Sequence, residues 1–403
     1  MPMPLEGIRA VDWTIWQQGP VCSAILGDLG ADVIKIEERV GGDPGRGMLR
    51  LAGLETNDRP NFYFGANNRN KRGITLDLKK PEARDVVYRL VETSDVFVQN
   101  FRKGVAERLG IGYGDLRRRN PKLIYASANG YGPLGPESAN PSFDYLGQAR
   151  SGIMMAAGEP EMPPCLIGGG VADQMGAIML AFGIVTALHA RERFGVGQEV
   201  NASLLSSMMF LQGLNLSARL ILGRAMPRAS RTSTFNPLWN HYRCADGRWI
   251  ALGMLQADRY WKDFCRAVGA ADLADDPRFQ DTPSRLANAG AAIAGVAAAF
   301  EKKPLAEWVA ILESAGDFVF APVASVDDLP DDPQVRANDY VVDFEHPTFG
   351  RLQTIGMPFQ LSETPGSVRR PAPEFGQHTE EVLTELLGYS WDDVARLRAA
   401  EVI

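Results

Sequence analysis

The sequence predicts an α/β protein: a parallel β-sheet with helices on both faces, followed by a smaller α+β region. Short apolar runs alternate with helical segments through residues 8–130, a pattern typical of strand–helix–strand units. Beyond residue 200 the pattern changes to a long helical segment, a basic connector and a hairpin. The chain of 403 residues is longer than one ordinary core, so two domains are expected.

The strands of the first region are predicted from short apolar runs. They cover residues 8–13, 32–37, 73–78, 95–101 and 123–130, with helices at 19–29 and 81–93. In a parallel sheet, ligands bind beyond the carboxyl ends of the strands. The residues that directly follow these runs are therefore candidates for a binding site.

The second region is predicted from turn signals and an Ala-rich segment. Residues 203–222 are expected to form a long helix, and HYRCADGRWIALGM a hairpin that turns at Asp246-Gly247. Another helix is expected at 287–300. Near the end of the chain, EHPTFGRLQTIG indicates a second hairpin, and two short helices follow Gly376.

Composition and charge exclude several classes of function. The 42 basic and 49 acidic residues give a net charge of −7, which argues against a nucleic-acid binder because such a protein needs a basic excess. The four cysteines and four histidines show no metal-ligand spacing, so no metal site is predicted. The N-terminus lacks a basic segment followed by an apolar one. A cytoplasmic protein is therefore expected.

The stretch from Val171 to Ala190 is long and apolar enough to be mistaken for a membrane span. Asp173 and Gln174 stand at its start, and two glycines interrupt it. We predict a fully buried helix and no membrane association.

A Gly-x-Gly-x-x-Gly pattern occupies residues 130–135, directly after a predicted strand. A dinucleotide fingerprint must open a helix, whereas Pro133, Pro136 and Pro141 predict a loop here. The pattern therefore does not support a nicotinamide-dependent dehydrogenase.

Two basic clusters lie next to predicted strands in the sequence. Residues 68–72 (Asn-Arg-Asn-Lys-Arg) form the denser one, and Arg102, Lys103 and Arg108 form the other. Such charges are either solvated loops or contacts to phosphoryl oxygens. The charge pattern leaves both interpretations open.

Asp173 follows three glycines, residues 168–170, and starts the long apolar helix. Aspartate is a common helix N-cap. The N-terminus of a helix also stabilises an ionised carboxylate, and glycines allow a substrate to approach the backbone. Local reasoning favours the N-cap and leaves a catalytic nucleophile open.

Several segments, in their order along the chain, resemble the class III (CaiB/BaiF-type) CoA-transferase family. The resemblance extends from about residue 4 to residue 400, through PLEGIRAVDWTIWQQGP, LGADVIKIE, NRNKRGITLDLKKPEAR, DVFVQNFRKGVAERLGIGY, IYASANGYGPLGP, SGIMMAAGEP, GGGVADQMGAIMLAFGIVTALHARERFGVGQEVNASLL and FGQHTEEVLTELLGYS.

The resemblance implies an activity and a set of site residues. It implies transfer of CoA from an acyl-CoA thioester to a carboxylic acid, with Asp173 as the nucleophile that forms a mixed anhydride and an aspartyl-CoA thioester. Gln17 is then a hydrogen-bond donor to the developing charge. The family positions that contact CoA fall on Trp16, Gln17, Gln18, Leu76, Lys79, Asn100, Phe101 and Arg108. CoA is the cosubstrate, and no metal or tightly bound cofactor is implied.

The resemblance also implies an interlocked homodimer whose active site lies between domains of different subunits. Its domains would be a large Rossmann-like CoA-binding domain (1–204), a helical linker (205–231), a small domain (232–330) and a tail that returns to the large domain (331–403). A monomer is then expected to be inactive.

The chain departs from its family at several positions. Glu38, beside Arg39, replaces a CoA-binding arginine of some relatives, and Pro141 replaces a lysine. The glycine-rich loop of oxalate-handling members is missing near residues 236–238, so oxalate and formate are not expected as substrates.

Two other functions remain as alternatives. The α-methylacyl-CoA racemases of the same fold place a histidine before an aspartate, but here Phe143 precedes Asp144 and cannot exchange a proton. Asp173 could still act as a base. A non-catalytic acyl-CoA binding protein is disfavoured because Asp173 and Gln17 are both present.

Overall fold

The computed structural model describes residues 1–48 and 59–403. Contacts divide the described chain into two compact units. Unit 1 consists of Met1–Met154, Leu166–Ala225 and Pro333–Ile403, and unit 2 of Met155–Cys165 and Met226–Asp332. The predicted domain bounds (1–204, 205–231, 232–330 and 331–403) stay a prediction.

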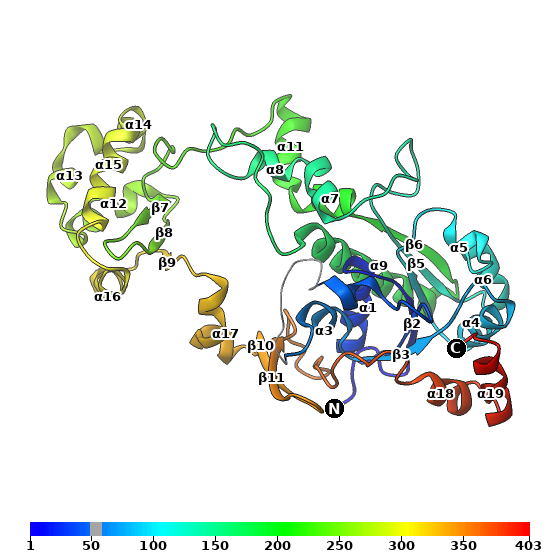
Figure 1. Ribbon diagram of the computed structural model, residues 1–403. Helices are drawn as coiled ribbons and strands as arrows, with labels where there is room; N and C mark the ends of the chain where they lie inside the picture. Colours follow the sequence, from blue (N-terminus) through cyan, green and yellow to red (C-terminus); the bar gives the residue numbers. More distant parts are fainter. Residues whose placement is uncertain (49–58) are drawn as a thin grey trace. The chain divides into compact units, whose positions relative to one another are not determined.

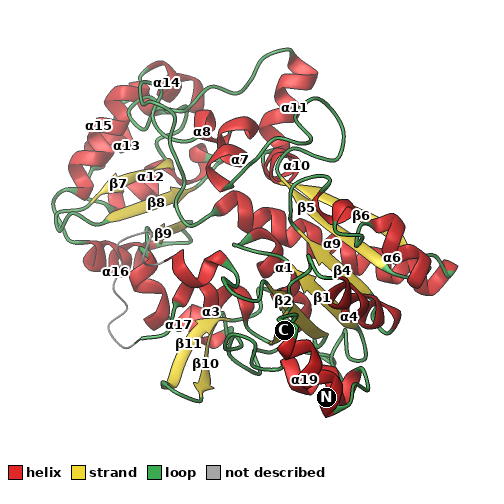
Figure 2. Ribbon diagram, turned by 45° about the vertical axis from the view of Figure 1, so that its right-hand side comes forward, coloured by secondary structure: helices red, strands yellow, loops and turns green. Residues whose placement is uncertain are grey.

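Unit 1 is built around a six-stranded parallel sheet, as predicted (Figure 2). The strands lie in the order β3-β2-β1-β4-β5-β6. Their bounds are β1 (Arg9–Trp13), β2 (Asp32–Glu37), β3 (Lys71–Thr75), β4 (Val96–Gln99), β5 (Ile124–Asn129) and β6 (Gln198–Ser203). The sequence analysis did not predict β6, because this edge strand is half exposed and lacks a continuous apolar run.

The strand order reverses between β1 and β4. From β1 the chain proceeds to β2 and β3 on one side, and then from β4 to β5 and β6 on the other. Both β2 and β4 pair with β1 in parallel. The carboxyl ends of β1 and β4 therefore diverge into separate loops, and such a switch point is where sheets of this kind bind ligands.

Helices cover both faces of the sheet (Figure 1). Those of unit 1 before the tail are α1 (Gln18–Asp28), α3 (Phe62–Asn68), α4 (Pro81–Glu92), α5 (Val105–Arg108), α6 (Tyr113–Arg119), α7 (Asp144–Ser151), α9 (Val171–Phe194), α10 (Leu204–Leu211) and α11 (Gly213–Leu222), and α8 (Ile153–Ala156) runs from unit 1 into unit 2. One core joins α1 and α9 to the sheet, and the other joins α4, α6 and the end of the tail to its opposite face.

The long helix α9 is not fully buried within this chain, so that prediction is wrong. Ala177, Leu180 and Ile184 face the sheet, whereas Phe182 and Val185 on the other side are exposed. By length and composition α9 is the one helix among the described residues that could cross a membrane.

The segment predicted as one helix at 203–222 is two, α10 and α11, which meet at Gln212. Unit 2 contains the predicted hairpin within a three-stranded antiparallel sheet. Its elements are β7 (Trp239–Arg243), β8 (Trp249–Gly253), β9 (Phe320–Pro322), α12 (Ala257–Ala267), α13 (Ala271–Asp275), α14 (Thr282–Ala287), α15 (Ala289–Phe300) and α16 (Leu305–Ala315).

The C-terminal tail belongs to unit 1. It contains α17 (Pro333–Ala337), the predicted second hairpin of β10 (Val341–His346) and β11 (Gly350–Ile355), then α18 (Thr379–Glu381), a π-helical turn (Val382–Leu386) and α19 (Trp391–Ala399). Val382, Leu397 and Val402 are buried in the same core as β1 and α4. The last residues therefore pack on the sheet that the first residues begin.

Candidate active site

A pocket of about 440 Å³ lies at the switch point of the sheet. Its walls are the loops that follow three strands: Ile15 and Trp16 after β1, residues 99–107 around the end of β4, and residues 127–133 around the end of β5. The Gly-x-Gly-x-x-Gly segment lies in this last wall and is a loop, as predicted. Asp173 also lines the pocket, together with Phe143.

Asp173 lies in the first turn of α9 but does not cap it, so the N-cap interpretation is wrong. The cap position is Gly170, in the left-handed conformation with φ of 69°. The capping carboxylate comes from Asp144, whose Oδ1 accepts hydrogen bonds from the Ala172 amide at 2.6 Å and the Asp173 amide at 3.2 Å. Gln148 donates to the other oxygen of Asp144 at 2.8 Å. The Asp173 side chain is thus left free of a capping role.

The surroundings of Asp173 bring its protonation equilibrium into the neutral pH range. Burial, and then the nearby negative charge of Asp144, raise the pKa of Asp173 from its ordinary value of 3.8 to about 7. Tyr63, on α3, is close enough that burial and the charges of Asp173, Asp43 and Asp144 raise the pKa of its phenol. Its hydroxyl is therefore a neutral hydrogen-bond donor at physiological pH.

The loop after β1 carries the predicted residues Trp16 and Gln17, and the predicted residue Gln18 begins α1. Gln17 Nε2 lies 3.4 Å from the carbonyl oxygen of Gly170, at the start of α9. A Cβ on Gly170 would come within 2.4 Å of the Gln17 amide, so this position requires glycine for space as well as for its φ. Gln18 is buried and packs against α9, and both Trp16 and Gln18 line the pocket.

Asn100 and Phe101, after β4, also line the pocket. The Asn100 side chain accepts from the Ile15 amide at 2.9 Å and donates to the Ile15 carbonyl at 2.7 Å. Phe101 stacks on Trp13 with ring centroids 4.0 Å apart. Both residues therefore join the β4 loop to the β1 loop, in addition to any contact with a ligand.

The remaining predicted CoA contacts, like Gln17, do not line this pocket. Leu76, after β3, is part of the hydrophobic core, Lys79 is exposed near it, and Arg108 is exposed on α5. Their contacts with CoA stay predictions.

The basic cluster at residues 68–72 is neither a solvated loop nor a set of free phosphate contacts. Arg69 pairs with Asp28 at 2.6 Å and Arg72 with Asp32 at 2.6 Å. Lys71 is fully buried and pairs with Asp12 at 2.8 Å. The open alternatives failed because β3 pairs beside β2, which brings these side chains to carboxylates far away in the sequence.

The sequence analysis missed Asp144 as a cap and Tyr63 as a neighbour of Asp173. In the sequence Asp144 stands out only as the residue after Phe143, and no local pattern shows that it caps a helix 27 residues later.

Trp16 and Phe143 meet edge to face, with ring centroids 6.1 Å apart, and both line the pocket. Arg39, beside Glu38, pairs with Glu401 at 3.0 Å. Among the described residues no group of His, Cys, Asp or Glu is arranged to hold a metal ion.

Comparison with known proteins gives one consistent family. The family described as CoA-transferase family III matches residues 5–379. The chain is 32% identical over 402 residues to (R)-2-hydroxy-4-methylpentanoate CoA-transferase of Clostridioides difficile, covering 100% of both chains. It is 31% identical to succinyl-CoA–D-citramalate CoA-transferase of Chloroflexus aurantiacus, covering 100% of this chain and 98% of the other. A CaiB/BaiF family protein from Brucella suis has a similar structure, with a TM-score of 0.85, 28% identity, and coverage of 96% of this chain and 100% of the other.

Proposed function

Because the chain belongs to CoA-transferase family III and is thus a CoA-transferase, we propose that it moves CoA from an acyl-CoA thioester to a carboxylic acid through covalent intermediates on Asp173. The observation that carries this proposal is the place of Asp173. It lines the pocket at the switch point, in the first turn of α9, with no capping role and with a pKa raised to about 7. A desolvated carboxylate of this kind is a stronger nucleophile than one in water.

In the first half of the reaction the Asp173 carboxylate attacks the carbonyl carbon of the donor thioester. The carbon–sulfur bond breaks, CoA leaves as a thiolate, and Asp173 is joined to the acyl group in a mixed anhydride. The thiolate then attacks Cγ of Asp173 and releases the donor acid. Asp173 now carries CoA as a thioester, and one difficult displacement has become two easier ones.

The second half is the same sequence with the acceptor acid. Its carboxylate attacks Cγ of Asp173, CoA leaves again, and the thiolate attacks the acceptor carbonyl to give the new acyl-CoA and free Asp173. Each step develops negative charge on an oxygen beside the first turn of α9. Gln17 Nε2 and the Tyr63 hydroxyl are the donors we assign to that charge, because both lie next to Asp173 or its helix.

CoA would enter along the loop after β4. Arg102 and Lys103 line the pocket there, and Arg108 follows on the next helix. Lys103 Nζ donates to the Pro133 carbonyl at 2.8 Å, so this ammonium connects the loop after β4 to the loop after β5 in the pocket wall. These three cations are the candidates for the phosphate groups of CoA.

The acids are not identified by the site. Relatives are named for 2-hydroxy-4-methylpentanoate, citramalate and, in Rhodopseudomonas palustris, oxalate. The Trp16–Phe143 pair gives this pocket an apolar aromatic wall. We therefore propose a partly apolar acid, rather than oxalate, as the acceptor.

We also propose that the active protein is a homodimer, located in the cytoplasm. The helices α9, α10 and α11 expose a series of large apolar side chains, which are Ile178, Phe182, Val185, Phe210, Leu211, Leu214, Leu220 and Ile221. Exposed apolar residues in such number are typical of a surface that a protein partner covers. Light scattering should give twice the chain mass, and an active monomer would contradict the dimer.

The proposed location in the cytoplasm is supported by the cysteines. All four are free thiols, in keeping with a reducing compartment.

The test is to trap the intermediate. The protein is incubated with succinyl-CoA, with or without a panel of branched 2-hydroxy acids, citramalate, mesaconate and oxalate, then treated with hydroxylamine and mapped by mass spectrometry. We expect label on Asp173, none in Asp173→Ala, and loss of label with the true acceptor.

Two other outcomes would contradict the proposal. Exchange of α-deuterium without any label would indicate a racemase, with Asp173 as a base. Binding of CoA with neither label nor exchange for any acyl-CoA would indicate a binding protein.

A further inference from the structure

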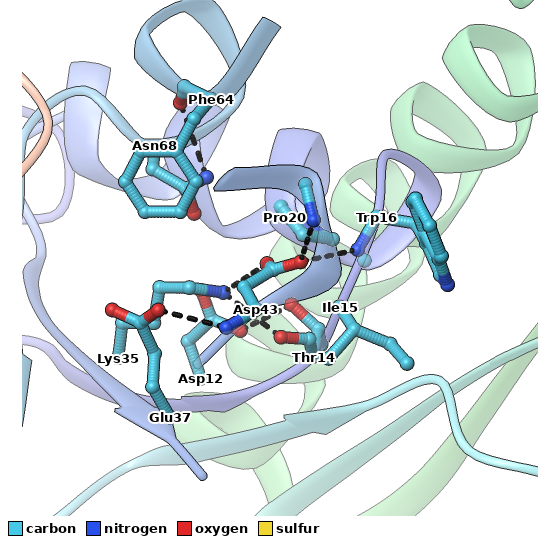
Figure 3. A network of polar contacts seen from close by, with 12 residues as sticks. Asp12, Thr14, Ile15, Trp16, Pro20, Lys35, Glu37, Asp43, Phe64 and Asn68 are labelled. Carbon is cyan, nitrogen blue, oxygen red and sulfur yellow. Dashed lines mark hydrogen bonds and ion pairs between the residues drawn. The ribbon is translucent and has the colours of Figure 1, made fainter. Parts of the chain in front are cut away.

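A cluster of buried charges lies beneath the loop that carries Trp16 and Gln17 (Figure 3). Its members come from β1, β2, β3 and the loop after β2, and all are at most 2% exposed. They are Asp12, Lys35, Glu37, Asp43 and Lys71. The proposed reaction uses none of them, and burying five charges is expensive unless each is paired.

The pairing in the cluster is nearly complete. Lys71 Nζ lies 2.8 Å from Asp12 Oδ2 and forms an ion pair with it. Lys35 Nζ lies 2.9 Å from Asp43 Oδ2, and this second ion pair lacks the alignment of a hydrogen bond. Glu37 pairs with Arg46 at 2.7 Å and accepts from the Asp43 amide at 2.9 Å. Asp43 is thus fixed both by its side chain and by its backbone.

The cluster directs several of its polar atoms at the loop after β1. Lys35 Nζ donates to the Thr14 carbonyl at 2.8 Å, and the Thr14 hydroxyl donates to Asp12. Asp43 Oδ1 accepts from the Trp16 amide at 3.0 Å, as Figure 3 shows. The loop backbone is therefore attached to buried charges at two points, the Thr14 carbonyl and the Trp16 amide.

The loop needs such attachment, because Trp16 adopts an unfavourable backbone conformation. Its φ is 66°, a left-handed value that costs a non-glycine residue about 1 kcal/mol or more. Without external hydrogen bonds the chain would relax to a common conformation. That relaxation would rotate the peptide that follows and move Gln17 away from the first turn of α9.

We infer that Asp43 is a positioning residue for CoA transfer: by holding the Trp16 amide over the buried cluster, it fixes the loop conformation that presents Gln17 to the start of α9. In this inference Asp43 acts through the loop and not by direct contact with the reacting atoms. The expected effect of Asp43 on turnover rests on the proposed function. Its expected effect on the loop conformation rests on the geometry alone.

The experiment compares Asp43→Ala, Asp43→Asn and a matched control, Asp28→Asn. Asp28 is equally buried and ion-paired in unit 1, at the far end of α1, and has no contact with the loop. Two quantities are measured: hydrogen exchange of the peptide that contains the Trp16 amide, without ligand, and kcat and KM with an acyl-CoA and an acceptor.

In Asp43→Ala we expect exchange at the Trp16 amide to be faster by about tenfold or more, because its acceptor is gone. We expect kcat to fall about 100-fold with little change in KM, since misplacing a catalytic group by about 1 Å has that effect. Asp43→Asn keeps an acceptor oxygen and should lose about tenfold in kcat, and Asp28→Asn less than about twofold at a similar loss of thermal stability.

Normal protection of the Trp16 amide in folded Asp43→Ala would overturn the inference, whatever the activity of the wild type. So would an equal loss of kcat in Asp28→Asn, because the effect would then be general destabilisation. If the wild type transfers no CoA, the proposed function fails, and the exchange measurement alone decides whether Asp43 holds the loop.

Discussion

Two pairs of carboxylates in unit 1 have opposite electrostatic surroundings. Asp12 and Asp43 lie under the β1 loop, each beside a buried lysine. Asp173 and Asp144 lie at the start of α9, where no cation pairs with either in the described part of the chain. Burial alone would raise the pKa of Asp12, but Lys71 and Lys35 outweigh it and lower that pKa. At Asp173 burial and a like charge act together and raise the pKa to about 7.

Desolvation by itself therefore does not distinguish a structural carboxylate from a reactive one. The presence of a counter-charge decides it. Asp12 and Asp43 have lysine partners, so these carboxylates are held in place and stabilise the β1 loop. Asp173 has no such partner, so its pKa is raised, and this lowers the unfolding free energy at high pH. Four substitutions test this comparison.

The largest effect is expected for Asp12→Asn. The change leaves Lys71 and Lys35 short of a counter-charge in a site without water contact, which should cost about 3–5 kcal/mol of unfolding free energy. Urea unfolding at pH 7 measures it. If the single variant does not fold, Asp12→Asn with Lys71→Met should recover much of the loss, and a double variant no more stable than the single one would contradict the pairing.

Asp173→Asn should raise the unfolding free energy at pH 8, whereas Asp12→Asn should lower it at pH 7. Because the native pKa of Asp173 is raised, the folded state binds an extra proton between pH 3.8 and about 7, and wild-type stability falls as the pH rises through that window. The variant should be more stable than the wild type by about 2–4 kcal/mol at pH 8 and nearly equal to it at pH 4. Urea unfolding at the two pH values checks this, and a destabilised variant at pH 8 would break the comparison.

Asp144→Asn is expected to shift the pH profile of activity. The proposed nucleophile is the ionised Asp173, so the wild-type rate should rise with pH through about 7. Removing the like charge lowers the pKa of Asp173, which should move this limb to lower pH, while the amide oxygen of Asn still caps α9. An unshifted profile would show that Asp144 acts only as a cap.

The smallest effect is expected for Glu307→Gln in α16. Glu307 pairs with Lys303 at 2.9 Å, but both side chains are more than 40% exposed. Its loss should change the unfolding free energy by no more than about 0.5 kcal/mol. A change as large as that of Asp12→Asn would contradict the expectation that an ion pair contributes strongly to stability only where it is buried.

Much of the fold could be predicted from the sequence. The apolar runs placed β1, β2, β4 and β5 within one or two residues, because a buried parallel strand must be apolar on both sides. The edge strand β6 escaped because half of it faces solvent. The full burial predicted for α9 failed for a related reason: an apolar sequence does not say whether its second face is covered by the same chain.

The layers of the sheet, the family and the position of Asp173 at the start of a long apolar helix could all be inferred from the sequence. The roles of the charged residues could not, because they depend on how the chain folds. Lys71 is paired 59 residues away with Asp12, and the N-terminus of α9 is capped from α7 by Asp144. The physical reason is that periodicity records which side of an element is buried, whereas the partner of a buried charge is set by which strands and helices pack together.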